Sequence, residues 1–172
     1  MNIKSLKSGQ EILFSGVIYT ARDQAHKRLV DIINNAGAQN FVPLPFDLKG
    51  QFIYYCGPTA TPKNKVIGSC GPTTSSRMDE FVEPLLKKGL LGMIGKGRRS
   101  KKVRNLIKKY KAVYLLAPAG CGALLAKKVL SKKLVAFKDL GPEAIYRLEV
   151  KDFPVIVGID SLGKDTYEDL CD

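Results

Sequence analysis

The stretch EILFSGVIYTARDQAHKRLVDIINNAG, residues 11–37, contains a strand signal followed directly by a helix signal. Residues 11–20 are rich in apolar, β-branched and aromatic side chains, whereas residues 21–37 carry apolar side chains at helical spacing and end in Gly37. The same alternation continues along the chain, which is typical of an α/β domain. We therefore expect a layered mixed sheet with helices packed on it.

The later segments alternate in the same way until the last third of the chain, which is mostly strand. No GxGxxG follows the first strand, and several strands close the chain without helices between them, so the pattern is not that of a Rossmann domain. The expected strands are residues 51–57, 90–97 and 112–119, and the expected helices are residues 76–89, 101–111 with Ser100 as cap, and 120–130.

Length and composition indicate one domain over residues 1–172, since 45% of the residues are hydrophobic. The first residues lack the features of a signal peptide, and the apolar stretch 113–126 is too short and broken to span a bilayer, so we expect a soluble cytoplasmic protein. The four cysteines lie far apart without a CxxC pair, which favours buried thiols. A metal site built from this chain alone is therefore not expected.

The net charge of +12 is distributed unevenly along the sequence. Residues 1–138 hold 25 Lys and Arg against 7 Asp and Glu, whereas residues 139–172 hold 3 against 9. This asymmetry suggests an anionic ligand or a charged partner. The densest basic run, residues 96–111, also has apolar side chains at helical spacing, which indicates the solvated face of an amphipathic helix. Residues 161–172 form an acidic tail that we expect either to contact a partner or to be flexible.

At two expected helix starts, residues 20–23 and 76–79, a hydroxyl residue precedes an aspartate by three positions, a pattern that predicts a hydroxyl N-cap at each start. Each start also places an arginine, Arg22 or Arg77, in the first turn, where the helix dipole disfavours a cation. One interpretation is that each arginine turns to its own aspartate or to solvent. The other is that a carboxylate or phosphate binds between the arginine and the helix N–H groups.

Three further positions fit an anion site. Gly71 precedes Thr73 and would let the backbone approach a ligand closely. Lys96 lies between two glycines at the end of an expected buried strand, where ligands of α/β sheets bind, although a solvated loop lysine has the same pattern. His26, the only histidine, falls on the helix face of Arg22 and is either a partly buried residue or a proton carrier. No nucleophile–base pair or metal-ligand set completes an enzyme, so the residues indicate half of a site.

Three ordered motifs, GVIYTARDQAHKRL (16–29), IGSCGPTTSSRMDEF (67–81) and MIGKGRRS (93–100), resemble the C-terminal domain of class I fumarate hydratases. The stretch APAGCGALLA resembles a further loop of this module, which also occurs as the separate beta subunit of fumarate hydratase and L-tartrate dehydratase. The resemblance implies a swivelling β/β/α domain and reversible addition of water across the double bond of a dicarboxylate. It also implies a [4Fe-4S] cluster that is carried by cysteines of the alpha subunit and acts as Lewis acid, so no metal ligand is expected in this chain.

The resemblance also assigns roles to the residues singled out above. The substrate-binding residues would be Arg22, Arg77, Lys96 and Thr73; the catalytic residues would be Thr73 and Lys96; and His26, Thr74 and Gly71 would support them. Thr73 would either transfer the proton or only hydrogen-bond the substrate, because an unassisted hydroxyl is a poor base at neutral pH.

The leading hypothesis is the beta subunit of a two-subunit hydro-lyase that converts fumarate to malate, working with an alpha subunit in a heterotetramer of two alpha and two beta chains. An L-tartrate dehydratase beta subunit is the near alternative. Two different classes stay open: a noncatalytic assembly subunit, and a basic nucleic-acid-binding module, for which no base-reading motif is present. The basic module would use residues 96–111 with Lys127, Lys128, Lys132 and Lys133.

Overall fold

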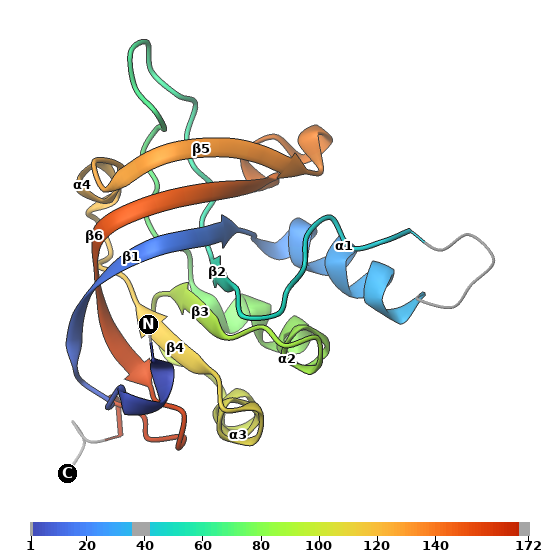
Figure 1. Cartoon of the computed structure of the whole chain (residues 1–172), viewed down its shortest axis with the longest axis vertical. Coiled ribbons are helices and arrows are strands. Elements are labelled where there is room, and N and C mark those ends of the chain that lie inside the picture. The colour runs from blue at the N-terminus through green and yellow to red at the C-terminus, as the bar shows by residue number, and fades with distance from the viewer. Residues whose placement is uncertain (1, 36–41, 169–172) are drawn as a thin grey trace.

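A computed structural model describes residues 2–35 and 42–168 and contains one mixed sheet with helices beside it (Figure 1). The strands follow the order β1-β2-β3-β4-β6-β5 across the sheet, and β1 also pairs with β6. Their bounds are β1 Glu11–Thr20, β2 Phe52–Tyr54, β3 Gly92–Gly95, β4 Val113–Leu116, β5 Val129–Ala136 and β6 Ile145–Ile159.

The pairing of β1 with β6 closes five of these strands into a small barrel. Strands β1, β2, β3 and β4 are parallel neighbours, and β6 runs antiparallel to both β4 and β1. Strand β5 lies outside the ring and pairs with β6. The mixed sheet and the packed helices were predicted from the sequence. The closure into a barrel was not predicted, because we expected only a layered mixed sheet.

The helices lie mainly on one side of the barrel, where α1, α2 and α3 are seen together (Figure 1). Their bounds are α1 Asp23–Asn34, α2 Val82–Lys87, α3 Lys101–Tyr110 and α4 Gly122–Ala126, with 3₁₀ helices η1 Ile3–Ser5, η2 Ser75–Phe81 and η3 Lys138–Glu143. The strands between barrel interior and helices are buried on both faces, as parallel strands usually are. In β2, for example, Phe52 and Tyr54 belong to one apolar cluster and Ile53 to the other.

The basic helix α3 shows how sequence pattern becomes structure. The Ser100 hydroxyl caps it by accepting a hydrogen bond from the Val103 N–H at 3.3 Å, as predicted. Val103, Leu106 and Ile107 are buried, so the basic side chains occupy the opposite face. The expected helix over residues 120–130 is shorter, because α4 ends at Ala126 and residues from 129 onward join β5. Gly37, the expected end of the first helix, lies outside the described residues.

The end of the described chain packs against the barrel. Ser161 and Asp165 are buried, and the backbone of Asp165 forms an antiparallel β-bridge with Ile159. Glu168 forms an ion pair with Arg104. Residues 169–172 are not described, so the single-domain and flexible-tail predictions stay predictions. Among the described residues, no helix is long and apolar enough to cross a membrane.

Candidate anion-binding site

The carboxyl ends of β1, β2 and β3 lie at one edge of the barrel, because the three strands are parallel neighbours. Arg22 follows β1 by two residues, and Lys96 directly follows β3. The segment carrying the threonines crosses this edge. The Thr73 N–H donates to the Tyr55 carbonyl at 2.7 Å, and Thr74 forms a parallel bridge with Lys96. The fold therefore brings three of the sequence motifs to one place.

The backbone on both sides of Lys96 is fixed by hydrogen bonds to buried groups. The Ser75 hydroxyl oxygen accepts from the Lys96 N–H at 3.0 Å, while the Ser75 N–H donates to the Lys96 carbonyl at 3.0 Å. The Tyr114 hydroxyl is hydrogen-bonded to Ser75 Oγ at 2.8 Å and to the Gly97 carbonyl at 2.9 Å. Lys96 thus lies on a loop whose backbone is held by several hydrogen bonds, and the residue itself is half-buried.

The two glycines that flank Lys96 have different reasons to be glycine. A Cβ on Gly95 would lie 2.0 Å from Ser75 Oγ, so any side chain there would displace the hydroxyl that holds the loop. Gly97 has φ +81°, a left-handed conformation that favours glycine. The sequence pattern Gly–Lys–Gly therefore encodes this loop geometry.

Arg22 and Arg77 meet at a single carboxylate, that of Asp23. Arg77 Nε and Nη2 donate to Asp23 Oδ1 and Oδ2 at 2.9 and 2.7 Å, which is a bidentate pair. Arg22 Nη2 lies 3.8 Å from Asp23 Oδ2 and 3.7 Å from Glu143 Oε1. The Arg77 side chain is 49% exposed and the Arg22 side chain 25% exposed, so the pair forms a cationic rim with Arg22 set deeper.

The predicted hydroxyl caps at both helix starts are wrong. Thr20 Oγ1 instead donates to the Ala144 carbonyl at 3.2 Å and accepts from the Tyr146 N–H at 3.0 Å. Arg22 is the N-cap of α1 and Thr74 that of η2, and neither makes a side-chain cap bond. Asp23 therefore takes part in no capping box. It pairs instead with Arg77, which lies at the other of the two helix starts.

His26 lies behind Arg22 and is fully buried. Its Nδ1 is 2.9 Å from the Arg22 carbonyl, so in the neutral ring Nδ1 carries the proton and donates it to that oxygen. Nε2 is buried and has no hydrogen-bond partner. Burial lowers the pKa of His26 from 6.5 to about 4, and the positive charge of Arg99 acts in the same direction. His26 is therefore neutral near pH 7 and touches the backbone of Arg22.

Arg99 is the residue that sequence reasoning missed. It belongs to the basic run 96–111, where we expected solvated charges, yet it is buried and donates from Nε to Asp79 Oδ1 at 2.7 Å. Its guanidinium also lies over the rings of Tyr55 and Tyr114, with Cζ 5.3 and 5.0 Å from the two ring centroids. Asp79 in turn accepts from the Ser100 N–H at 2.9 Å, so this pair ties η2 to the start of α3. An arginine within a basic run, next to a helix cap, gives no sequence signal for such burial.

The remaining predicted residues lie near the site in less constrained positions. Thr73 is half-buried and Thr74 exposed. Gly71 lies 3.5 Å, measured from an ideal Cβ, from the Cα of Gly122, so its backbone approaches the start of α4. Cys70 donates its N–H to the Gly122 carbonyl at 3.1 Å, which joins the two glycine loops.

Among the described residues, the cysteines do not form a metal site. Burial raises the pKa of the Cys70 thiol to about 11 and that of Cys56 still further. Cys121 is partly exposed, and Cys171 lies outside the described residues. Within residues 2–35 and 42–168, no three His, Cys, Asp or Glu side chains gather as metal ligands. The residues described here therefore do not fit an iron–sulfur cluster as its ligands.

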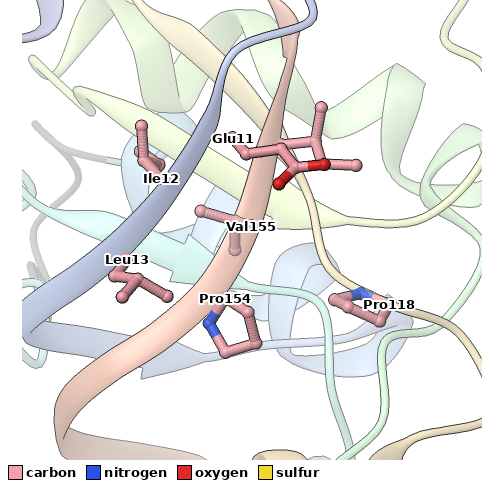
Figure 2. A pocket seen from close by; sticks show the side chains of 7 residues that line it. Glu11, Ile12, Leu13, Pro118, Pro154 and Val155 are labelled. Atoms are coloured by element: carbon pink, nitrogen blue, oxygen red, sulfur yellow. The ribbon is translucent and has the colours of Figure 1, made fainter.

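A surface hollow of about 520 Å³ lies elsewhere, along β1 and β6 (Figure 2). Its lining is mostly apolar and includes Leu13, Pro118 and Pro154. A second hollow, of about 470 Å³, lies between the loop that follows β2 and α4. Neither is lined by Arg22, Arg77 or Lys96, so the cationic rim lies apart from both hollows.

Comparison with known proteins gives consistent matches. A family model described as Fumarase C-terminus matches residues 1–170. A Methanocaldococcus jannaschii protein with the provisional name L(+)-tartrate dehydratase subunit beta is 41% identical over 175 residues, which cover 98% of this chain and 87% of the relative. Fumarate hydratase 1, mitochondrial, of Leishmania major is 40% identical over 158 residues, and the aerobic class I fumarate hydratase of Escherichia coli strain K12 is 37% identical over 158 residues. Both alignments cover 91% of this chain but only 28% of the relative.

Proposed function

Because the chain belongs to the Fumarase C-terminus family, we propose that it is the beta subunit of a [4Fe-4S]-dependent hydro-lyase that hydrates fumarate to malate reversibly. The chain is homologous to class I fumarate hydratases and to a protein named as a tartrate dehydratase beta subunit. The observation that carries the proposal is the meeting of Arg22, Arg77 and the rigid Lys96 loop at one edge of the barrel. In this family setting, the closed barrel would be a form of the swivelling β/β/α domain.

L-tartrate is the second candidate substrate. The Methanocaldococcus relative carries that name and is matched over 87% of its length, whereas each fumarate hydratase is matched over 28%. Fumarate and tartrate share the spacing of their carboxylates and differ in hydroxylation. A small number of contacts would therefore be enough to distinguish the two substrates. The same cationic rim would serve either substrate.

The proposal assigns the rest of the enzyme to a second chain. The Methanocaldococcus relative is named as a beta subunit and is matched over 87% of its length, which supports an alpha subunit as partner, and we propose a heterotetramer of two alpha and two beta chains. The cluster would belong to that subunit, since no three His, Cys, Asp or Glu side chains of the described residues gather as metal ligands. An exposed rim that becomes covered by the alpha subunit also explains why Arg77 is about half exposed here. We place the assembled enzyme in the cytoplasm.

The residues of this chain would bind and orient the dicarboxylate. Two carboxylates need two cationic contacts, and Arg22, Arg77 and Lys96 supply three cations on fixed backbone. Hydration adds hydroxide to one alkene carbon and a proton to its neighbour. In the reverse direction the carbon next to a carboxylate loses its proton, and the charge that spreads onto that carboxylate would be stabilised by these cations.

Thr73 would supply a hydroxyl group to this rim. Its backbone is held by Tyr55, and a nearby ammonium such as Lys96 would be needed for its hydroxyl to carry a proton. Replacing Thr73 by Val should lower kcat if the hydroxyl transfers the proton. A variant that raised only KM would reduce Thr73 to a hydrogen-bonding role.

The proposal is tested by anaerobic assay with fumarate, L-malate and L-tartrate, using this chain alone and mixed with a cluster-loaded alpha subunit. Activity is expected only in the mixture. The substrate that is converted identifies which hydro-lyase the enzyme is. Arg22→Ala and Arg77→Ala should each lower kcat/KM by about a hundredfold or more, since each removes a charged contact to the substrate. Arg28→Ala, which alters an arginine of α1 that pairs with Asp139, is the matched control.

Two results would contradict the proposal. Unchanged activity of both arginine variants would favour a noncatalytic assembly subunit. Steeply salt-dependent binding of duplex nucleic acid, together with no hydro-lyase activity of an intact mixture, would favour the basic binding module.

A further inference from the structure

Asp23 occupies a position that the proposed reaction does not by itself explain. It lies on the first turn of α1, it is 23% exposed, and it is the one carboxylate within ion-pair distance of both Arg22 and Arg77 in the described part of the chain. One of its oxygens, Oδ2, faces Nη2 of both arginines, at 3.8 and 2.7 Å. A carboxylate placed between two substrate-binding arginines could compete with the substrate or hold the arginines in place.

The geometry of the Arg77 pair distinguishes these two roles. A guanidinium can bind a carboxylate through its Nε/Nη2 edge or through its Nη1/Nη2 edge. Asp23 takes the Nε/Nη2 edge of Arg77 with both oxygens. The Nη1/Nη2 edge is left for a second carboxylate, and the plane of the guanidinium is fixed by the first.

The contacts of Arg22 are complementary to this arrangement. Among the described residues, Arg22 has only long ion-pair contacts, to Asp23 and Glu143 at 3.8 and 3.7 Å, and its buried Nε has no hydrogen-bond partner. Glu143 is itself engaged by the Gln24 N–H at 2.9 Å. Arg22 therefore keeps unsatisfied donors, while the shared Asp23 sets its distance from Arg77.

We infer that Asp23 is a positioning residue, which orients Arg77 and spaces it from Arg22 so that the two arginines can hold one dicarboxylate. The inference rests on the proposed function. Asp23 would not touch the substrate itself. Its role on the first turn of α1 would be to support substrate binding and not to cap the helix.

The test is a double-mutant cycle in the assembled enzyme with fumarate and L-tartrate as substrates. Asp23→Asn keeps the size of the side chain but loses the charge and one of the two acceptors that face Arg77, so KM should rise about tenfold. Arg77→Lys removes the fork that Asp23 binds, so adding Asp23→Asn to Arg77→Lys should change KM less than twofold, a non-additive result. A role confined to folding would give the same increment in both backgrounds.

Asp139→Asn is the matched control, because Arg28 and Asp139 also form a bidentate pair, here through the Nη1/Nη2 edge of Arg28, between α1 and η3 without touching Arg22 or Arg77. It should leave KM unchanged. Equal KM values for Asp23→Asn and Asp139→Asn in an active wild-type enzyme would overturn the inference while leaving the proposed function intact. An inactive wild-type mixture with an intact cluster would instead count against the proposed function itself.

A measurement on the unmutated protein covers the case in which Asp23→Asn fails to fold. The ¹⁵N signal of Arg77 Nε–H reports the bond to Asp23 directly. If Asp23 positions Arg77, saturating fumarate should leave that N–H protected from exchange with water. Loss of protection on fumarate binding would mean that the substrate displaces Asp23, and the inference would be wrong.

Discussion

Acid should destabilise this protein through His26, and the size of the effect follows from its burial. The pKa of His26 is lowered from 6.5 to about 4 in the folded chain, chiefly by burial. In the unfolded chain His26 is therefore protonated below about pH 6.5, whereas in the folded chain it is protonated only below about pH 4. The free energy of unfolding consequently falls as the pH decreases through this window. Between about pH 7.5 and about pH 5 the free energy of unfolding should fall by about 2 kcal/mol from His26 alone.

The measurement is urea unfolding of wild type and His26→Asn at both pH values. Asparagine keeps an N–H donor for the Arg22 carbonyl but does not titrate in this range, so the difference between the two pH dependences isolates His26. Because His26 is the only histidine, its ring proton signals also give the pKa directly by NMR. A titration midpoint between about 6 and 7, together with equal pH dependences, would refute the argument that burial keeps this ring neutral.

Three further variants test the packing around Lys96. Ser75→Ala leaves the Lys96 N–H without its acceptor, so the free energy of unfolding should fall by about 2 kcal/mol in urea titrations, whereas Ser131→Ala, which alters an exposed serine, should change it by less than about 0.5 kcal/mol. Gly95→Ala places a Cβ 2.0 Å from Ser75 Oγ and should lower stability by about 1–3 kcal/mol, and an unchanged Tm would contradict the close approach. Asp79→Asn leaves a buried guanidinium without its counter-charge and should cost about 3 kcal/mol or more in the same titrations, and a loss below about 1 kcal/mol would show that the pair is not buried in solution.

The parts of the fold that depend on local periodicity could be predicted from the sequence. The strand and helix around Arg22, the short strand before Lys96 and the Ser100 cap all follow from residues close to one another in the chain. The same local patterns predicted Arg22 and Lys96 just after strands. Both residues lie at one edge of the barrel because β1, β2 and β3 are parallel neighbours.

The parts that depend on distant partners could not be predicted. The Thr20 hydroxyl is used by Ala144, which is 124 positions away, so a local capping pattern pointed to the wrong acceptor. Arg99 is buried because folding brings Asp79 and two tyrosine rings around it, whereas its sequence neighbours are basic and mostly exposed. The Asp23–Arg77 pair likewise joins residues 54 positions apart. Each case depends on tertiary contact, which neither spacing nor composition records.

The pairing of β1 with β6 has a consequence for how the chain acquires its structure. Glu11 lies opposite Ile156, so the ring closes only when residues near the two ends of the described chain find each other. Contacts so far apart in sequence make folding slow, because a large loop must be ordered before they form. During synthesis on the ribosome, β1 and β4 would each keep one edge unpaired until β6 has emerged, because β6 is the strand that pairs with both.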